Sequence, residues 1–111
     1  MRIALVDDSE IERGILLSLI TDYGCEKQIL FESDCFDSGD AFLSSFSSDK
    51  YDIVFMDIFM NGMSGVETAS KIRLIESHVI LDFLTDSSDY ISDVFCIHAL
   101  HYVLHTYQQE A

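Results

Sequence analysis

Two short apolar runs, each ending in acidic residues, constrain the fold more than any other feature of this sequence. The first, residues 3–6, is followed directly by Asp7 and Asp8, and the second, residues 53–56, is followed by Asp57. Runs of this length and composition are typical of strands that are buried on both faces of a parallel sheet. Ligands bind where the carboxyl ends of neighbouring parallel strands meet. The pattern therefore predicts three carboxylates at one crevice, where their mutual repulsion would be offset by a divalent cation.

Beyond these two runs, apolar segments alternate with segments of helical periodicity, which indicates βα units and a parallel sheet. Strands are predicted at about 2–7, 29–35, 51–57, 79–84 and 101–104. These units predict one α/β domain over residues 1–111, with a doubly wound five-stranded parallel sheet in the order 2-1-3-4-5. Only seven residues follow the last strand, so the fifth helix is expected to be short or missing. We interpret the chain as a fragment, or as lacking residues near its end.

The predicted helices have recognisable ends. Two of them begin with the capping-box spacing, in which a serine and a glutamate three residues later each accept a hydrogen bond from the other's backbone: Ser9 with Glu12, and Ser64 with Glu67. Another helix is expected to begin at Asp37 or Ser38, and a fourth to span about 88–98. Gly24 is the expected end of the first helix.

The composition limits the classes of function. A formal charge of −14, with only six scattered basic residues, argues against direct contact with nucleic acid or anionic lipid. No apolar stretch approaches the ~18 residues that span a bilayer. Three cysteines without CxxC spacing (Cys25, Cys35 and Cys96) indicate reduced thiols, and no signal-peptide pattern precedes the first strand. A cytoplasmic protein is therefore expected.

Three motifs at the ends of predicted strands and one within the last predicted strand resemble the receiver domain of two-component response regulators. They are the pair Asp7 and Asp8, Asp57 within FMDIFMNGMSGVE, Thr85 within LTDSSDY, and Tyr102 within ALHYVLH. The resemblance covers residues 1 to about 105, nearly the whole chain. In finer detail the sequence is similar to the LytTR class of regulators.

The resemblance implies a role for each motif. Asp57 would be the phosphoacceptor. Mg²⁺ would be held by Asp7, Asp8, Asp57 and the backbone carbonyl of Phe59, with Asp7 acting through a metal-bound water that it helps to orient. Thr85 would donate a hydrogen bond to the phosphoryl group. Tyr102 would then respond to the movement of that threonine, as part of a switch.

The resemblance also implies partners. A histidine kinase would supply the phosphoryl group, and the domain would catalyse its own phosphorylation and dephosphorylation without acting as an enzyme on external substrates. The surface of the fourth helix and fifth strand would control an output domain, expected to be a C-terminal DNA-binding domain that controls transcription and lies outside this chain. The oligomeric state stays open: a homodimer through the same surface is compatible with the sequence, although the short or missing fifth helix argues against it.

Two positions depart from the family pattern. His105 stands where the family has a lysine that reaches the phosphoryl group, and no lysine or arginine follows Arg73. Asp86 adds negative charge directly after Thr85, where the family has a small residue. In addition, Asp82 interrupts an apolar strand, so it should be paired, protonated or displaced to the surface.

Other interpretations of these residues remain open. A pair of aspartates is often a turn or a helix cap, Thr85 is compatible with an ordinary strand end, and Tyr102 is compatible with the core. The main alternative function is a degenerate receiver that binds a partner without phosphorylation, which His105 and Asp86 favour. A phosphohydrolase with an aspartyl nucleophile is a third hypothesis, but the sequence lacks the DxD arrangement and the lysine expected of one.

Overall fold

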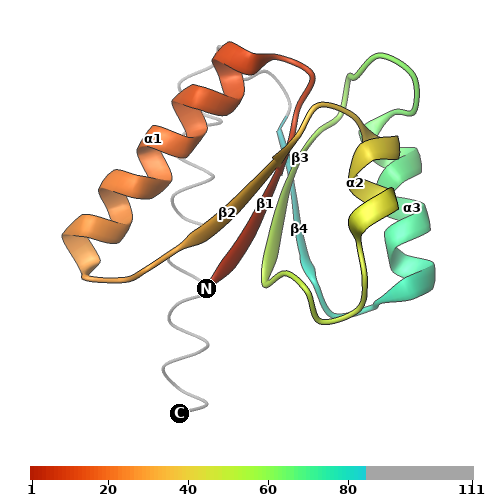
Figure 1. The fold of residues 1–111 in the computed structure, drawn as a ribbon. Coiled ribbons are helices and arrows are strands. Elements are labelled where there is room, and N and C mark those ends of the chain that lie inside the picture. The colour runs from red at the N-terminus through yellow and green to blue at the C-terminus, as the bar shows by residue number, and fades with distance from the viewer. Residues whose placement is uncertain (85–111) are drawn as a thin grey trace.

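The fold is described by a computed structural model for residues 1–84, in which strands and helices alternate along the chain (Figure 1). The elements are β1 (Arg2–Val6), α1 (Glu10–Lys27), β2 (Glu32–Phe36), α2 (Gly39–Ser45), β3 (Ile53–Asp57), α3 (Gly65–Ile75) and β4 (Ile80–Leu84). All strand pairs are parallel, and the strand order is β2-β1-β3-β4. The predicted α/β class and the first four positions of the strand order are confirmed. The predicted fifth strand, and the helices expected on either side of it, lie outside the described residues.

The sheet is covered on both faces, with α1 on one side and α2 and α3 on the other (Figure 1). Side chains of a strand alternate between its two faces, so Ile3 and Leu5 pack toward α1 while Ala4 and Val6 pack toward α2 and α3. All four are at most 1% exposed. Burial on both faces explains why the central strands are unbroken apolar runs in the sequence. The two central strands, β1 and β3, are parallel neighbours, so their carboxyl ends lie at the edge of the sheet where the crevice is predicted.

Serine side chains cap the starts of all three described helices. The Oγ atoms of Ser9, Ser38 and Ser64 accept hydrogen bonds from the backbone N–H groups three residues later. The predicted starts at Ser9 and Ser64 are therefore confirmed, and Ser38 rather than Asp37 caps α2.

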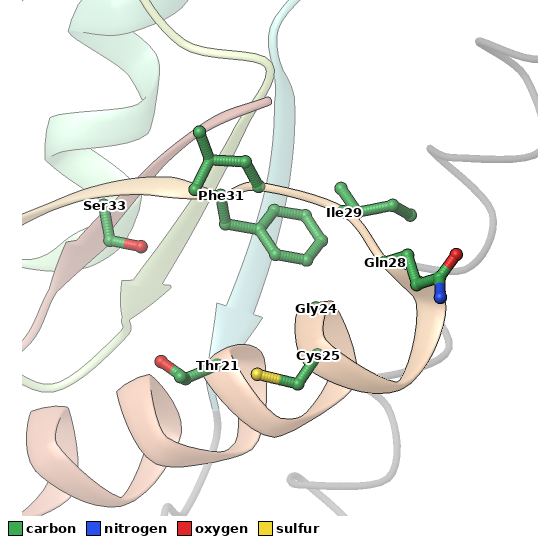
Figure 2. Close-up of a pocket in the computed structure, with 8 residues that line it drawn as sticks. Thr21, Gly24, Cys25, Gln28, Ile29, Phe31 and Ser33 are labelled. Carbon is green, nitrogen blue, oxygen red and sulfur yellow. The ribbon is translucent and has the colours of Figure 1, made fainter.

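The predicted end of the first helix at Gly24 is wrong. Helix α1 continues to Lys27, and Gln28 takes the left-handed conformation that ends it, with φ of 59°. Gly24 instead permits a close approach, because a Cβ atom there would lie 2.8 Å from the Ile29 carbonyl oxygen and from the Phe31 ring. Figure 2 shows this region, where the chain turns back from α1 toward β2 beside a cavity of about 350 Å³. Gly24 therefore allows the segment before β2 to pack against α1, and it does not end the helix.

Candidate functional site

Two neighbouring strands bring three carboxylates together. In the register of β1 and β3, Val6 is paired with Met56, so that Asp7 follows β1 at the level of Asp57, the last residue of β3. One carboxylate oxygen from each of Asp7, Asp8 and Asp57 lies within 4.8 Å of the other two. The convergence expected from the two apolar runs is therefore present in the structure.

Asp7 is the most firmly held of the three. It is 3% exposed, and its Oδ1 atom accepts a hydrogen bond of 2.9 Å from the backbone N–H of Ser9. Its own backbone N–H donates to the carbonyl of Phe36, while the Arg13 guanidinium donates to its backbone carbonyl. Contacts from α1 and β2 thus fix both the main chain and the side chain of Asp7.

The loop after β3 is attached to the other two carboxylates. The backbone N–H of Asn61 donates to Asp8 Oδ2 at 3.1 Å, and that of Phe59 donates to Asp57 Oδ1 at 3.3 Å. The Phe59 side chain is 77% exposed. The assignment of the Phe59 carbonyl to a metal site stays a prediction, because the described contacts place only its N–H against a carboxylate.

A close backbone contact holds the far end of this loop. The backbone N–H of Gly65 donates to the carbonyl of Ile58 at 2.9 Å. A Cβ atom on Gly65 would lie only 2.2 Å from the Asp57 carbonyl oxygen. The start of α3 can therefore approach the end of β3 only because residue 65 has no side chain.

Burial and like charges both disfavour ionisation in this cluster. Burial raises the pKa of Asp57 to about 6, and the neighbouring charges of Asp7 and Asp8 act in the same direction. Burial likewise raises the pKa of Asp7, although the hydrogen bond from Ser9 lowers it in part. Carboxylate oxygens are ligands that Mg²⁺ prefers. The positive charge of a bound Mg²⁺ would favour the ionised forms of these three carboxyl groups.

The remaining predicted site residues divide into two groups. Thr85, Asp86, Tyr102 and His105 lie outside the described residues, and their roles stay predictions. Asp82 lies in β4, where no described residue donates to its buried Oδ2 atom, and burial raises its pKa to about 6. Of the three states considered for Asp82, this environment favours protonation.

Sequence analysis missed two residues near the cluster. In the sequence Arg13 is one of six scattered basic residues, but in the structure its guanidinium donates to the Asp7 carbonyl. The sequence indicates a capping role for Glu12, but the Ser9 N–H that its carboxylate would accept from donates to Asp7 Oδ1 instead. The available signal was helical spacing, because Glu12 lies four residues before the buried Leu16 and shares its face.

The chain belongs to the response regulator receiver domain family, whose pattern it matches over residues 3–111. This family functions in two-component signal transduction. The predicted family is therefore confirmed. In the described part of the chain, no helix combines the length and the apolar character needed to cross a membrane.

Two curated relatives agree with the predicted LytTR class. The sensory transduction protein LytT of Bacillus anthracis is 28% identical over 110 residues, and the transcriptional regulatory protein LytR of Staphylococcus aureus is 24% identical over the same length. Each match covers 99% of this chain but only 43% of the relative. The chain thus spans less than half the length of these relatives.

Among solved structures, the response regulator TrrA of Thermotoga maritima is similar to this chain. Its complex with Mg²⁺ and BeF is 37% identical, with a TM-score of 0.57, and the match covers 66% of this chain and 58% of that one. TrrA in complex with the histidine kinase ThkA is 35% identical, with a TM-score of 0.66, and the match covers 80% of this chain and 72% of that one.

Proposed function

We propose that this domain is a phosphorylation-dependent switch that accepts a phosphoryl group on Asp57 from a histidine kinase, in a reaction that requires Mg²⁺. The observation that carries the proposal is the convergence of Asp7, Asp8 and Asp57 within 4.8 Å at the carboxyl edge of a receiver fold. TrrA, which is similar in sequence, forms complexes with Mg²⁺-BeF and with a histidine kinase.

The proposed chemistry assigns one step to Asp57. A carboxylate oxygen of Asp57 attacks the phosphorus atom, the bond from phosphorus to the kinase histidine breaks, and an acyl phosphate forms. Hydrolysis of the acyl phosphate returns the free carboxylate and inorganic phosphate. The domain would thus catalyse only its own modification and its reversal.

The other residues of the site would position the reacting groups. Asp7, Asp8, Asp57 and the Phe59 carbonyl would hold Mg²⁺, which would supply positive charge to the phosphoryl oxygens. The N–H groups that fix Asp7 and Asp8 would keep these carboxylates in place before phosphorylation. Thr85 would donate to the phosphoryl group, and Tyr102 would transmit its movement.

The partners are part of the same proposal. Residues 1–111 would form the receiver domain, and a C-terminal DNA-binding domain would provide a transcriptional output. The length and name of LytR support this arrangement, because the matched region is only 43% of that transcriptional regulator. The surface of the fourth helix and fifth strand would control the output and mediate a homodimer. The proposed location is the cytoplasm, where the kinase would deliver the phosphoryl group.

A degenerate receiver is the second candidate, because His105 stands at the family's lysine position and Asp86 follows Thr85. Such a domain would bind its partner through the same fold without being phosphorylated. The two candidates differ in one measurable property: the first is phosphorylated on Asp57, and the degenerate receiver is not.

Intact-mass spectrometry after incubation with acetyl phosphate tests the proposal. The wild-type chain should gain one phosphoryl group in the presence of Mg²⁺ and none in EDTA. Asp57→Asn should gain none in either case, and Asp22→Asn, which changes an exposed carboxylate on α1, should behave as the wild type does. A folded wild-type chain that gains no phosphoryl group with Mg²⁺ would support the degenerate receiver.

A further inference from the structure

Glu12 lies on the face of α1 that packs against the sheet. It precedes Leu16 by four residues and Ile20 by eight. Both side chains are buried, with Leu16 6% exposed and Ile20 1% exposed. Residues with this spacing share one helix face. Figure 1 shows that the first turn of α1, which contains Glu12, lies at the edge of the sheet where β1 ends. The start of α1 therefore lies at the same edge of the sheet as the carboxylate cluster, and the spacing of Glu12 places it on the helix face that Leu16 and Ile20 share.

One carboxylate oxygen of Glu12 is buried and has no hydrogen-bond donor. This Oε2 atom and Asp82 Oδ2 are the two buried side-chain oxygens without a partner in the described part of the chain. The usual donor for a glutamate at this position is the N–H of Ser9, but that group donates to Asp7 Oδ1. A buried acceptor without a donor is unfavourable, so a donor from outside the described protein groups would stabilise this oxygen.

The charge of Glu12 acts on the cluster. It is one of the charges that raise the pKa of Asp7, after burial and the charge of Asp8. However, Glu12 does not belong to the group of carboxylates whose oxygens lie within 4.8 Å of one another. Glu12 is thus near enough to influence Asp7 electrostatically but does not join the three inner carboxylates.

We propose that Glu12 is an outer ligand of the metal site, whose carboxylate accepts a hydrogen bond from a water molecule bound to the cation. This inference rests on the proposed Mg²⁺ site and adds a fourth carboxylate to it. Mg²⁺ in proteins keeps several of its water ligands, and these waters are hydrogen-bond donors. The proposed bond gives the buried oxygen its donor, and the added negative charge strengthens binding of the cation.

Calorimetric titration of the wild-type chain and two variants with MgCl₂ tests the inference. Loss of an outer partner lowers metal affinity by about 10- to 100-fold, and we expect Glu12→Gln to raise the dissociation constant about tenfold. Glu10→Gln is the matched control, because it removes the same charge from the same helical turn at an exposed position. It should change the constant by less than about twofold, since exposed charges are screened by salt.

Thermal unfolding in EDTA checks that the variants fold. Glu12→Gln should unfold at the same temperature as the wild type or higher, because it removes a negative charge that repels Asp7. The increase in unfolding temperature that Mg²⁺ produces should be smaller for Glu12→Gln than for Glu10→Gln.

The outcomes separate this inference from the proposed function. A Glu12→Gln variant that binds Mg²⁺ as tightly as Glu10→Gln, while the wild type also binds, would overturn the outer-ligand role alone. A folded wild-type chain that shows no Mg²⁺ binding would overturn both this role and the proposed metal site.

Discussion

Asp57 combines partial burial with two like-charged neighbours, and both raise its pKa, to about 6. An aspartate with this pKa is partly protonated near neutral pH, and only the ionised form is a nucleophile. A cation bound among Asp7, Asp8 and Asp57 would favour that ionised form. The same cluster would therefore hold the metal and keep the phosphoacceptor ready for attack.

Asp82 offers a prediction at the scale of one residue. Its folded pKa of about 6 lies above the unfolded value of 3.8, so the folded state binds the proton more tightly. The stability that this proton provides is complete below pH 3.8 and is lost as the pH rises through 6. Asp82→Asn removes the titration, and it should stabilise the chain by roughly 1–2 kcal/mol at pH 7 and by little at pH 4.

Urea unfolding of the wild type and Asp82→Asn at both pH values measures this difference. Asp57 titrates in both proteins, so the comparison isolates Asp82. Asp22→Asn, at an exposed position, should change stability little at either pH. A loss of stability in Asp82→Asn at pH 7 would mean that the ionised carboxylate has a favourable partner.

At the scale of elements, local sequence signals predicted the helix starts but not all of their surroundings. Ser9 and Ser64 were identifiable because a cap depends on residues only three positions apart. Gly24 was misassigned because its role depends on Phe31, which folds back against it from the next segment. The second hydrogen bond of the Ser9 capping box, from the Ser9 N–H to the Glu12 carboxylate, is also absent. The Ser9 N–H donates to Asp7 Oδ1 instead.

Gly65 provides the prediction at this scale, because the contact between α3 and the end of β3 depends on it. A Cβ atom at residue 65 would lie 2.2 Å from the Asp57 carbonyl oxygen, a backbone atom that cannot rotate away. Gly65→Ala should therefore destabilise the chain by more than about 2 kcal/mol and weaken Mg²⁺ binding. Gly14→Ala is the control, because nothing lies within 4 Å of a Cβ atom there, and it should stabilise α1 by about 0.5–1 kcal/mol.

Chemical denaturation gives the two stabilities, and calorimetry gives the metal affinity. If Gly65→Ala were as stable as the wild type, the start of α3 would have to move freely relative to Asp57. The close approach would then not be what positions the loop after β3.

At the scale of the whole molecule, the sequence predicted the fold well because the information was distributed along the chain. Alternating runs gave the α/β class, and the two central strands gave the three carboxylates at one edge. The sequence did not reveal that the N–H of Asn61 holds Asp8, because this contact joins segments 53 residues apart. The roles of Thr85, Tyr102 and His105 stay predictions based on the family resemblance.

The distribution of charge also belongs to this scale. The chain has 20 acidic and six basic residues. The ion pairs of the described part join Arg2, at the start of β1, to Glu32 and Asp34 in β2. Within residues 1–84, no basic side chain forms an ion pair with Asp7, Asp8 or Asp57. A bound cation would offset the repulsion among these three carboxylates.

Unfolding temperatures in MgCl₂ and in NaCl at matched ionic strength test this conclusion. Both salts screen the repulsion expected at a formal charge of −14, but only Mg²⁺ should also bind the cluster. At a hundred times its dissociation constant, a specific ligand adds about 2.7 kcal/mol to the free energy of unfolding. Asp8→Asn should abolish most of the additional effect of MgCl₂ and leave the effect of NaCl unchanged, whereas Asp22→Asn should retain both. Equal effects of the two salts on the wild type would show that screening alone stabilises this acidic chain.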